Sequence, residues 1–276
     1  MMCEPDAPPR FSIVTITLNS ADAAERTARS VLAQRGATFE YIVKDGGSHD
    51  DTVSRLRTLG VEQLVVTPDR GIYDAMNQGL ARCRGDYVCL MNAGDTFAGP
   101  DVLATVAAHL VRLGEPEFAY GDIRSLVRHP HLRDEDQQGG RLIRYPERLS
   151  RFWLYRKMIC HQAWFVRREL YTAVPYDPDY AILADYSYLL DMLLRRRVRY
   201  AHIPEVVAIF DAGGLSTRRS EQQRLERQRV HRATFSAPER WLYGGLFQSI
   251  GWLNRRFVYR LYPLLPEPVR GRLGGL

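Results

Sequence analysis

Four short polar segments carry the side chains best suited to chemistry in this 276-residue chain. They are Asn19 at the end of the first apolar run, Asp45–Ser48, Asp69–Gly71 and Asn92–Asp95. Carboxylates and amides can bind a hard divalent cation, a nucleoside or a sugar hydroxyl. Each segment alone is also typical of an ordinary turn, because turns use Asp, Asn, Gly and Ser. The four segments form a site only if the fold brings them together.

Each segment follows a short apolar run that predicts a buried strand, and predicted helices lie between the runs. The expected strands are Phe11–Asn19, Phe39–Ser48 (ending in turn residues), Glu62–Pro68 and Asp86–Asn92. The expected helices are 21–34, a stretch ending at 59, and 73–83. This alternation predicts βαβ units and a mostly parallel sheet. Because ligands bind beyond the carboxyl ends of such strands, we expect the four segments to converge.

Beyond residue 100 the alternation weakens. The sequence predicts a helix over 101–113, antiparallel strands in 117–129 and 141–146, a helix after Ala184, a strand over 198–210 and a glycine-rich loop over 211–219. Past Arg218 the chain reads as helical and rich in arginine. The proline-rich first ten residues predict a loose tail.

The composition, 45% hydrophobic and 25% charged, excludes a disordered or fibrous chain. Four cysteines, at 3, 83, 89 and 160, lack the paired short spacing of a zinc site. With no secretory leader, we expect reduced thiols in the cytosol.

Positive charge is concentrated at the C-terminal end. Residues 218–276 carry twelve arginines and four glutamates, a net charge of +8, whereas the whole chain carries +6. The longest uncharged run, Trp241–Asn254, is too short and too rich in glycine to span a bilayer. Aromatic residues mixed with arginines favour a helix lying at a membrane surface. A helix packed on the catalytic domain, or on a second copy of it, is the alternative.

Five motifs carry a resemblance to a known family: "DGGSHDDT", "DRGIYDAMNQGL", "GDYVCLMNAGD", "HQAWFVRRELY" and "ADYSYLLDMLL". Residues 11–217 resemble the inverting, nucleotide-sugar-dependent glycosyltransferases of family 2, in particular members that assemble bacterial polysaccharides. The resemblance implies a GT-A fold, an α/β Rossmann-like mixed sheet with helices on both faces. It divides the chain into a tail (1–10), a nucleotide-sugar half (11–100), an acceptor half (101–217) and a C-terminal helical extension (218–276).

In such enzymes a divalent metal, Mn²⁺ or Mg²⁺, offsets the charge of the leaving diphosphate. The resemblance assigns Asp95 to the metal and makes Asn92 either a neutral ligand or a partner of the donor sugar. The family usually has two acidic residues in this loop, whereas this chain has one. The alternative is that Asp95 caps the following turn.

The resemblance places the nucleotide at the first three strand ends. Asp45 corresponds to the carboxylate that accepts a hydrogen bond from the nucleobase, which suits uracil. Asp69 and Arg70 form the next part, where a guanidinium can stack on the base or pair with phosphate. Thr17 and Asn19 would touch the nucleoside. The alternative for Arg70 is a surface pair with Asp69.

The resemblance also assigns the acceptor side. Asp185 matches the aspartate that deprotonates the acceptor hydroxyl, and a helix N-cap is its alternative. His161 and Gln162 resemble a pair beside the acceptor, although a lone histidine can be purely structural. Asp122 is a supporting donor-site candidate.

A last motif is a glycine-rich loop near residue 215. Its Gly214, Ser216 and Thr217 could close over the diphosphate, or the loop could be a linker.

The predicted function is transfer of a sugar, with inversion, from a UDP-linked donor to a saccharide or lipid-linked saccharide in cell-surface polysaccharide synthesis. The expected location is cytoplasmic, peripheral on the inner face of the cell membrane. One alternative is a nucleotide-sugar-binding partner protein with a degenerate site. Another is a nucleotidyltransferase, although no glycine-rich, lysine-bearing loop follows the first strand. The aromatic residues beside the arginines argue against a nucleic-acid partner.

Overall fold

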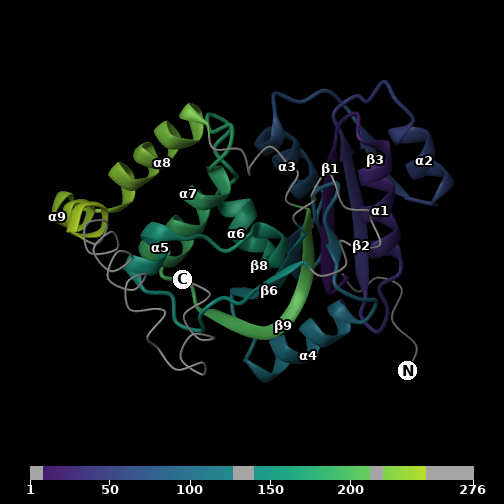
Figure 1. Ribbon diagram of the computed structural model, residues 1–276. Coiled ribbons are helices and arrows are strands. Elements are labelled where there is room, and N and C mark those ends of the chain that lie inside the picture. Colours follow the sequence, from purple (N-terminus) through teal and green to yellow (C-terminus); the bar gives the residue numbers. More distant parts are fainter. Residues whose placement is uncertain (1–8, 127–139, 212–219, 247–276) are drawn as a thin grey trace, which may run out of the picture.

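A mixed nine-stranded sheet with helices on both faces forms the body of the protein (Figure 1). The computed structural model describes residues 9–126, 140–211 and 220–246. The strands are β1 (Phe11–Thr17), β2 (Phe39–Asp45), β3 (Gln63–Val66), β4 (Tyr87–Leu90), β5 (Thr96–Phe97), β6 (Phe118–Leu126), β7 (Arg141–Ile143), β8 (Trp164–Arg167) and β9 (Tyr200–Asp211). The helices are α1 (Ala21–Leu32), α2 (Thr52–Thr58), α3 (Ile72–Leu80), α4 (Val102–Arg112), α5 (Arg151–Arg156), α6 (Arg168–Ala173), α7 (Ala184–Leu190), α8 (Glu221–Thr234) and α9 (Ala237–Trp241).

The N-terminal half is the predicted parallel βαβ unit. Its strands lie in the order β3-β2-β1-β4, and every neighbouring pair is parallel. The chain moves outward from β1 to β3 and then crosses back to β4. Because such crossovers are right-handed, α1 and α2 lie on one face and α3 on the other (Figure 1).

The second half extends the sheet with mixed strands, in the order β8-β6-β9-β5 after β4. The predicted antiparallel pairing of β6 with β7 is confirmed. β8 pairs antiparallel with both β4 and β6, so it joins the two halves. The sequence pattern did not indicate β5, which is only two residues long and depends on its pairing with β9.

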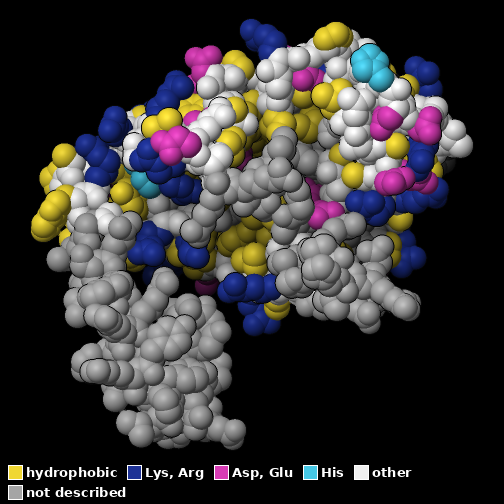
Figure 2. All heavy atoms as spheres, turned by 45° about the horizontal axis from the view of Figure 1, so that its top comes forward, with side chains coloured by type: hydrophobic (Ala, Val, Ile, Leu, Met, Phe, Trp, Pro, Cys, Tyr) yellow, Lys and Arg dark blue, Asp and Glu magenta, His cyan; other side chains and the backbone are white. Residues whose placement is uncertain are grey.

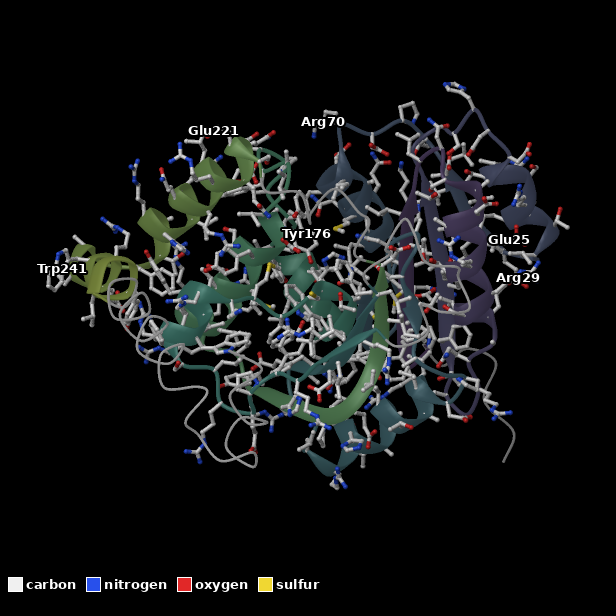
Figure 3. All side chains as sticks on the ribbon, in the orientation of Figure 1. Glu25, Arg29, Arg70, Tyr176, Glu221 and Trp241 are labelled. Carbon is white, nitrogen blue, oxygen red and sulfur yellow. The ribbon has the colours of Figure 1, made fainter. Side chains whose placement is uncertain are left out.

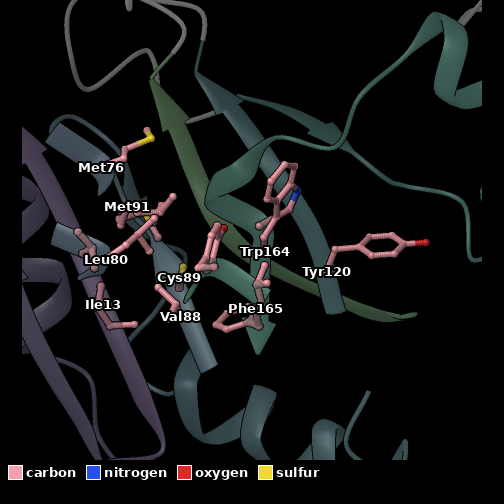
Figure 4. Packing of buried hydrophobic residues seen from close by; sticks show 14 of the residues in the cluster. Ile13, Met76, Leu80, Val88, Cys89, Met91, Tyr120, Trp164 and Phe165 are labelled. Carbon is pink, nitrogen blue, oxygen red and sulfur yellow. The ribbon is translucent and has the colours of Figure 1, made fainter. Parts of the chain in front are cut away.

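Helix α3 lies close to β1 at Gly79. A Cβ atom on Gly79 would come within 2.6 Å of Val14 Cγ1, so only glycine fits this contact. Figure 4 shows Leu80 of α3 beside Ile13 of β1 in the buried cluster. This close packing fixes the position of α3 on the sheet.

The C-terminal extension begins as predicted, with helices, and α8 packs on α7. Val230 is fully buried, and His231 is 3.0 Å from the hydroxyl of Tyr186 in α7. The proposed boundary at residue 217 falls outside the described ranges and stays a prediction. Within those ranges, no helix combines the length and apolar character that crossing a bilayer requires.

A buried ion pair joins the ends of β2 and β3. The ammonium of Lys44 is fully buried and lies 2.8 Å from Asp69 Oδ2. Its other two protons go to the carbonyl oxygens of Asp45 and Thr67, at 3.0 and 2.7 Å. Such a pair is stable because all three protons have acceptors.

We predict that Lys44→Met lowers the free energy of unfolding by about 3 kcal/mol, because the Asp69 carboxylate then loses its buried partner. The matched control is Lys157→Met, since Lys157 is exposed and its loss should change stability by less than about 0.5 kcal/mol. Urea denaturation of both variants measures the difference. Equal effects would show that the buried pair contributes nothing.

Candidate functional site

The four predicted segments do converge at one edge of the sheet. Asn19 donates its backbone N–H to Ser48 Oγ at 2.8 Å, which joins the ends of β1 and β2. The Ala93 N–H donates to Ile16 O at 3.3 Å, joining β4 to β1. The Lys44 contact to Asp69 adds the third segment. The expectation from strand alternation is therefore confirmed.

Asp45 organises the loop that follows β2. Its side chain is fully buried, and its Oδ1 accepts the N–H groups of Gly47 and Ser48 at 2.9 and 2.7 Å. Oδ2 accepts the Ser48 hydroxyl at 2.5 Å. The carboxylate thus shapes the Gly-Gly-Ser turn. Its contact with a nucleobase stays a prediction.

Thr17 and Asn19 lie beside this turn. The Thr17 hydroxyl is 2.7 Å from that of Ser20, and Asn19 has a positive φ of 46° at the exposed end of β1. A hollow of about 510 Å³ adjoins Asn19 and is also lined by the start of α1 and by Asp50 and Arg55. Its lining includes none of the carboxylates Asp45, Asp95 and Asp185.

Arg70 extends away from the body, and 79% of its side chain is exposed (Figure 3). Its partner is Asp74, at 3.5 Å, rather than Asp69. The alternative pairing with Asp69 is therefore wrong, because Lys44 occupies that carboxylate. A largely exposed guanidinium on a weak i,i+4 pair remains able to reach a ligand.

Asp95 forms a buried link between the two halves. Its side chain accepts a hydrogen bond from Gln162 Nε2 at 2.6 Å and another from the Asp211 backbone N–H at 2.9 Å. Burial raises the pKa of Asp95 to about 6. Neither donor belongs to the following turn, so the turn-cap alternative is wrong. The two acceptor oxygens hold the loop after β4 against β9 and the segment before β8.

Asp185 is the second residue of α7 and is 6% exposed. Its Oδ1 accepts the Tyr186 N–H at 2.8 Å and is 3.0 Å from the Tyr73 hydroxyl. Its Oδ2 lies 3.1 Å from His161 Nδ1. The helix N-cap is Leu183, so Asp185 is not the cap that the alternative required.

His161 connects Asp185 to the loop after β4. Its Nε2 is 3.0 Å from Asn92 Nδ2, while its Nδ1 faces Asp185. An amide nitrogen only donates, so His161 Nε2 accepts the hydrogen bond from Asn92. The proton of the neutral ring is then on Nδ1, which donates a hydrogen bond to Asp185. The histidine thus joins Asn92, in the loop after β4, to the carboxylate predicted as the base.

Tyr73 and Asn77 of α3 are partners that sequence reasoning missed. The Tyr73 hydroxyl is 2.6 Å from Ile182 O as well as 3.0 Å from Asp185, so its single proton is shared. Burial and the Asp185 carboxylate raise the pKa of Tyr73 well above its ordinary value, so it remains a donor. Asn77 exchanges two hydrogen bonds with the Tyr176 backbone. The sequence feature that could have identified these two residues is their spacing of four, which places both on one helix face.

Two amide oxygens in this region have no hydrogen-bond partner in the part of the chain that the structure describes. They are Asn92 Oδ1 and Gln162 Oε1, and both are buried. Native proteins rarely leave such acceptors unpaired. No group of three or more His, Cys, Asp or Glu able to hold a metal occurs in the described ranges. One carboxylate beside unpaired amide oxygens nevertheless fits a hard cation that takes further oxygens from phosphates.

Asp122 belongs to a different cluster. Its Oδ1 is 2.8 Å from His202 Nε2 and accepts the Tyr145 N–H at 3.0 Å, next to an irregularity in the β6–β9 pairing. The structure therefore groups Asp122 with β9 and the segment before α5, and its donor-site role stays a prediction. Gly214, Ser216 and Thr217 lie outside the described residues.

Comparison with known proteins identifies the family. Residues 12–173 match Glycosyl transferase family 2. A PGL/p-HBAD biosynthesis glycosyltransferase of Mycobacterium bovis (strain BCG / Pasteur 1173P2) is 33% identical over 231 residues, covering 80% of this chain and 84% of the relative.

Solved structures show the same fold at low sequence identity. S. aureus TarS 1-349 in complex with UDP aligns with a TM-score of 0.61 at 14% identity, over 94% of this chain and 75% of that one. Mannosyltransferase PcManGT from Pyrobaculum calidifontis, in complex with GDP-Man and Mn²⁺, aligns with a TM-score of 0.54 at 17% identity, over 94% and 84%. The expected GT-A-like fold is thereby confirmed. This chain belongs to glycosyl transferase family 2 and is a glycosyltransferase.

Proposed function

We propose that this enzyme transfers a sugar, with inversion, from a nucleoside-diphosphate donor to a hydroxyl group that Asp185 deprotonates. The observation that carries the proposal is the fixed position of Asp185, which His161 links to Asn92 in the loop after β4. Its Oδ1 faces Tyr73 and Tyr186, and its Oδ2 faces one donor, His161. A carboxylate oxygen has two lone pairs, so Oδ2 keeps one for a proton.

The reaction follows from that geometry. The acceptor oxygen attacks the anomeric carbon as its proton moves to Asp185 Oδ2, and the bond from that carbon to the diphosphate oxygen breaks. Attack from the face opposite the leaving group inverts the configuration. The proton on His161 Nδ1 keeps the carboxylate oriented, in the way that a neighbouring donor fixes a catalytic side chain.

The proposed donor site lies at the ends of β1 to β4. We assign the nucleotide to Thr17, Asn19, Asp45, Asp69 and Arg70, and the donor sugar to Asn92, with Asp122 in a supporting role. UDP is the favoured nucleotide because an acceptor-only carboxylate such as Asp45 suits the imide N–H of uracil, and the TarS structure contains UDP. The family assignment leaves no support for the nucleotidyltransferase alternative.

A divalent cation fits the same edge of the sheet. Asp95, with the unpaired Asn92 Oδ1, would hold it, and the PcManGT structure contains Mn²⁺. When bound, the cation offsets negative charge on the leaving diphosphate. The link from Asp95 to Gln162 would place this cation site next to the acceptor pair His161 and Gln162.

We also propose a lipid-linked saccharide or growing glycan as acceptor, at the inner face of the cell membrane. The surface of α8 and the α9 end carries exposed apolar side chains, Leu225 (53%), Trp241 (68%) and Leu242 (37%). Exposed arginines of α8, such as Arg224 and Arg229, lie on the same element, and Figure 2 shows basic and hydrophobic side chains together on this side. Such a surface suits anionic lipid headgroups.

The donor is tested with a set of UDP- and GDP-sugars in Mn²⁺ and in EDTA, using thermal stabilisation for binding and product formation for transfer. The proposal predicts binding of a UDP-sugar that EDTA weakens. Asp185→Asn should retain donor binding and lose transfer by a factor of roughly 10² or more. Asp191→Asn is the matched control, because Asp191 pairs with Arg196 instead. Donor binding with no transfer in the wild-type protein, with any acceptor tried, would favour the degenerate partner protein.

The membrane surface is tested with Trp241→Ser and liposomes that contain anionic lipid. Binding should fall several-fold, because an exposed indole contributes both apolar area and an interfacial preference. Val111→Ser is the control, since Val111 is also 68% exposed but lies on α4. An equal effect of the two substitutions would reject this surface.

A further inference from the structure

A buried carboxylate of α8 holds the backbone that leads into α7. Glu226 is 8% exposed. Its Oε1 accepts the Ala181 N–H at 2.9 Å, and its Oε2 accepts the N–H groups of Ile182 and Leu183 at 3.0 and 2.9 Å. Three successive backbone donors therefore converge on one side chain that lies more than forty residues further along the chain.

This contact anchors the backbone immediately before α7. The N–H groups of Ala181 and Ile182 precede the helix, and the third belongs to its N-cap residue, Leu183. The first N–H groups of a helix have no partner within it, and α7 has no side-chain cap from its N-cap residue, Leu183. A carboxylate that accepts several backbone N–H groups forms charge-assisted hydrogen bonds, which are shorter and stronger than neutral ones. Burial of the charge is tolerated because these donors are in place. Glu226 thus fixes where α7 begins.

Helix α3 also holds this segment, through a carbonyl oxygen rather than an N–H group. Ile182 donates its N–H to Glu226, and its carbonyl oxygen lies 2.6 Å from the Tyr73 hydroxyl. Asp185 follows three residues later and contacts that same hydroxyl. Two further contacts join α8 to α7, because Tyr186 meets His231 at 3.0 Å and lies under the Arg227 guanidinium at 4.9 Å.

We propose that Glu226 is a positioning residue for transfer: it sets the place of the Asp185 carboxylate relative to the acceptor hydroxyl. The inference rests on the proposed role of Asp185 as base. Helix α8, which lies beyond the family match that ends at residue 173, is then required for the catalytic geometry. Displacement of a catalytic group by about 1 Å can cost roughly 10²-fold in rate.

The test compares Glu226→Gln with Glu221→Gln in the full-length protein. The amide keeps the size of the side chain but turns an NH₂ group toward backbone donors. We expect kcat to fall roughly tenfold or more, with the donor KM within about twofold of the wild-type value. Glu221 is exposed on the same helix and pairs only with Arg224 among the described contacts, so its variant should keep wild-type kinetics.

A merely structural role would appear as a rise in donor KM or as loss of the folded circular-dichroism spectrum at the assay temperature. If Glu226→Gln does not fold, Glu226→Asp retains the charge with a shorter reach. The proposal predicts a reduced kcat for that variant with an unchanged donor KM. A wild-type kcat for either folded variant would overturn it.

A double-mutant cycle with Asp185→Asn separates this inference from the proposed function. If Glu226 acts through Asp185, adding Glu226→Gln to Asp185→Asn lowers residual transfer by much less than it lowers wild-type transfer. Equal factors in the two backgrounds would overturn the positioning role. Wild-type transfer by Asp185→Asn alone would instead reject the base assignment.

Discussion

A buried carboxylate needs hydrogen-bond donors, and the structure supplies those of Asp185 from three separate parts of the chain. Tyr73 comes from α3, His161 from the turn before β8, and the third donor is the neighbouring backbone N–H of Tyr186. Without them, keeping this charge at 6% exposure would cost several kcal/mol. The orientation of the Asp185 carboxylate therefore depends on correct assembly of the two halves.

Other features maintain that assembly. Gly79 lets α3 approach β1 closely, so that Tyr73 reaches the second half. Lys44 fixes the segment that precedes α3 through Asp69. Asp95 and Gln162 join the loop after β4 to the turn that carries His161. The proposed donor site and the proposed base thus belong to one hydrogen-bonded structure.

The sequence was sufficient to predict the parallel half of the sheet, because apolar runs alternate with amphipathic helices at short intervals. The convergence of the four strand ends followed from the same rule. Contacts between distant segments could not be predicted in this way. Nothing in the local sequence distinguishes Glu226 from the exposed Glu221 on the same helix. A lysine such as Lys44 is expected at the surface, and its burial follows only from the burial of β2 on both faces of the sheet. The short β5 exists only through its pairing with β9.

The most direct measurement of the central claim is the kinetics of Tyr73→Phe, which removes one oxygen atom. If Tyr73 holds Asp185 for proton transfer, kcat should fall roughly tenfold, as expected for loss of a hydrogen bond to a charged group. The dissociation constant of the donor should be unchanged, because the Tyr73 hydroxyl contacts Ile182 and Asp185 and none of the residues proposed to hold the nucleotide. An unchanged kcat, or a loss confined to donor binding, would contradict the coupling of α3 to the base.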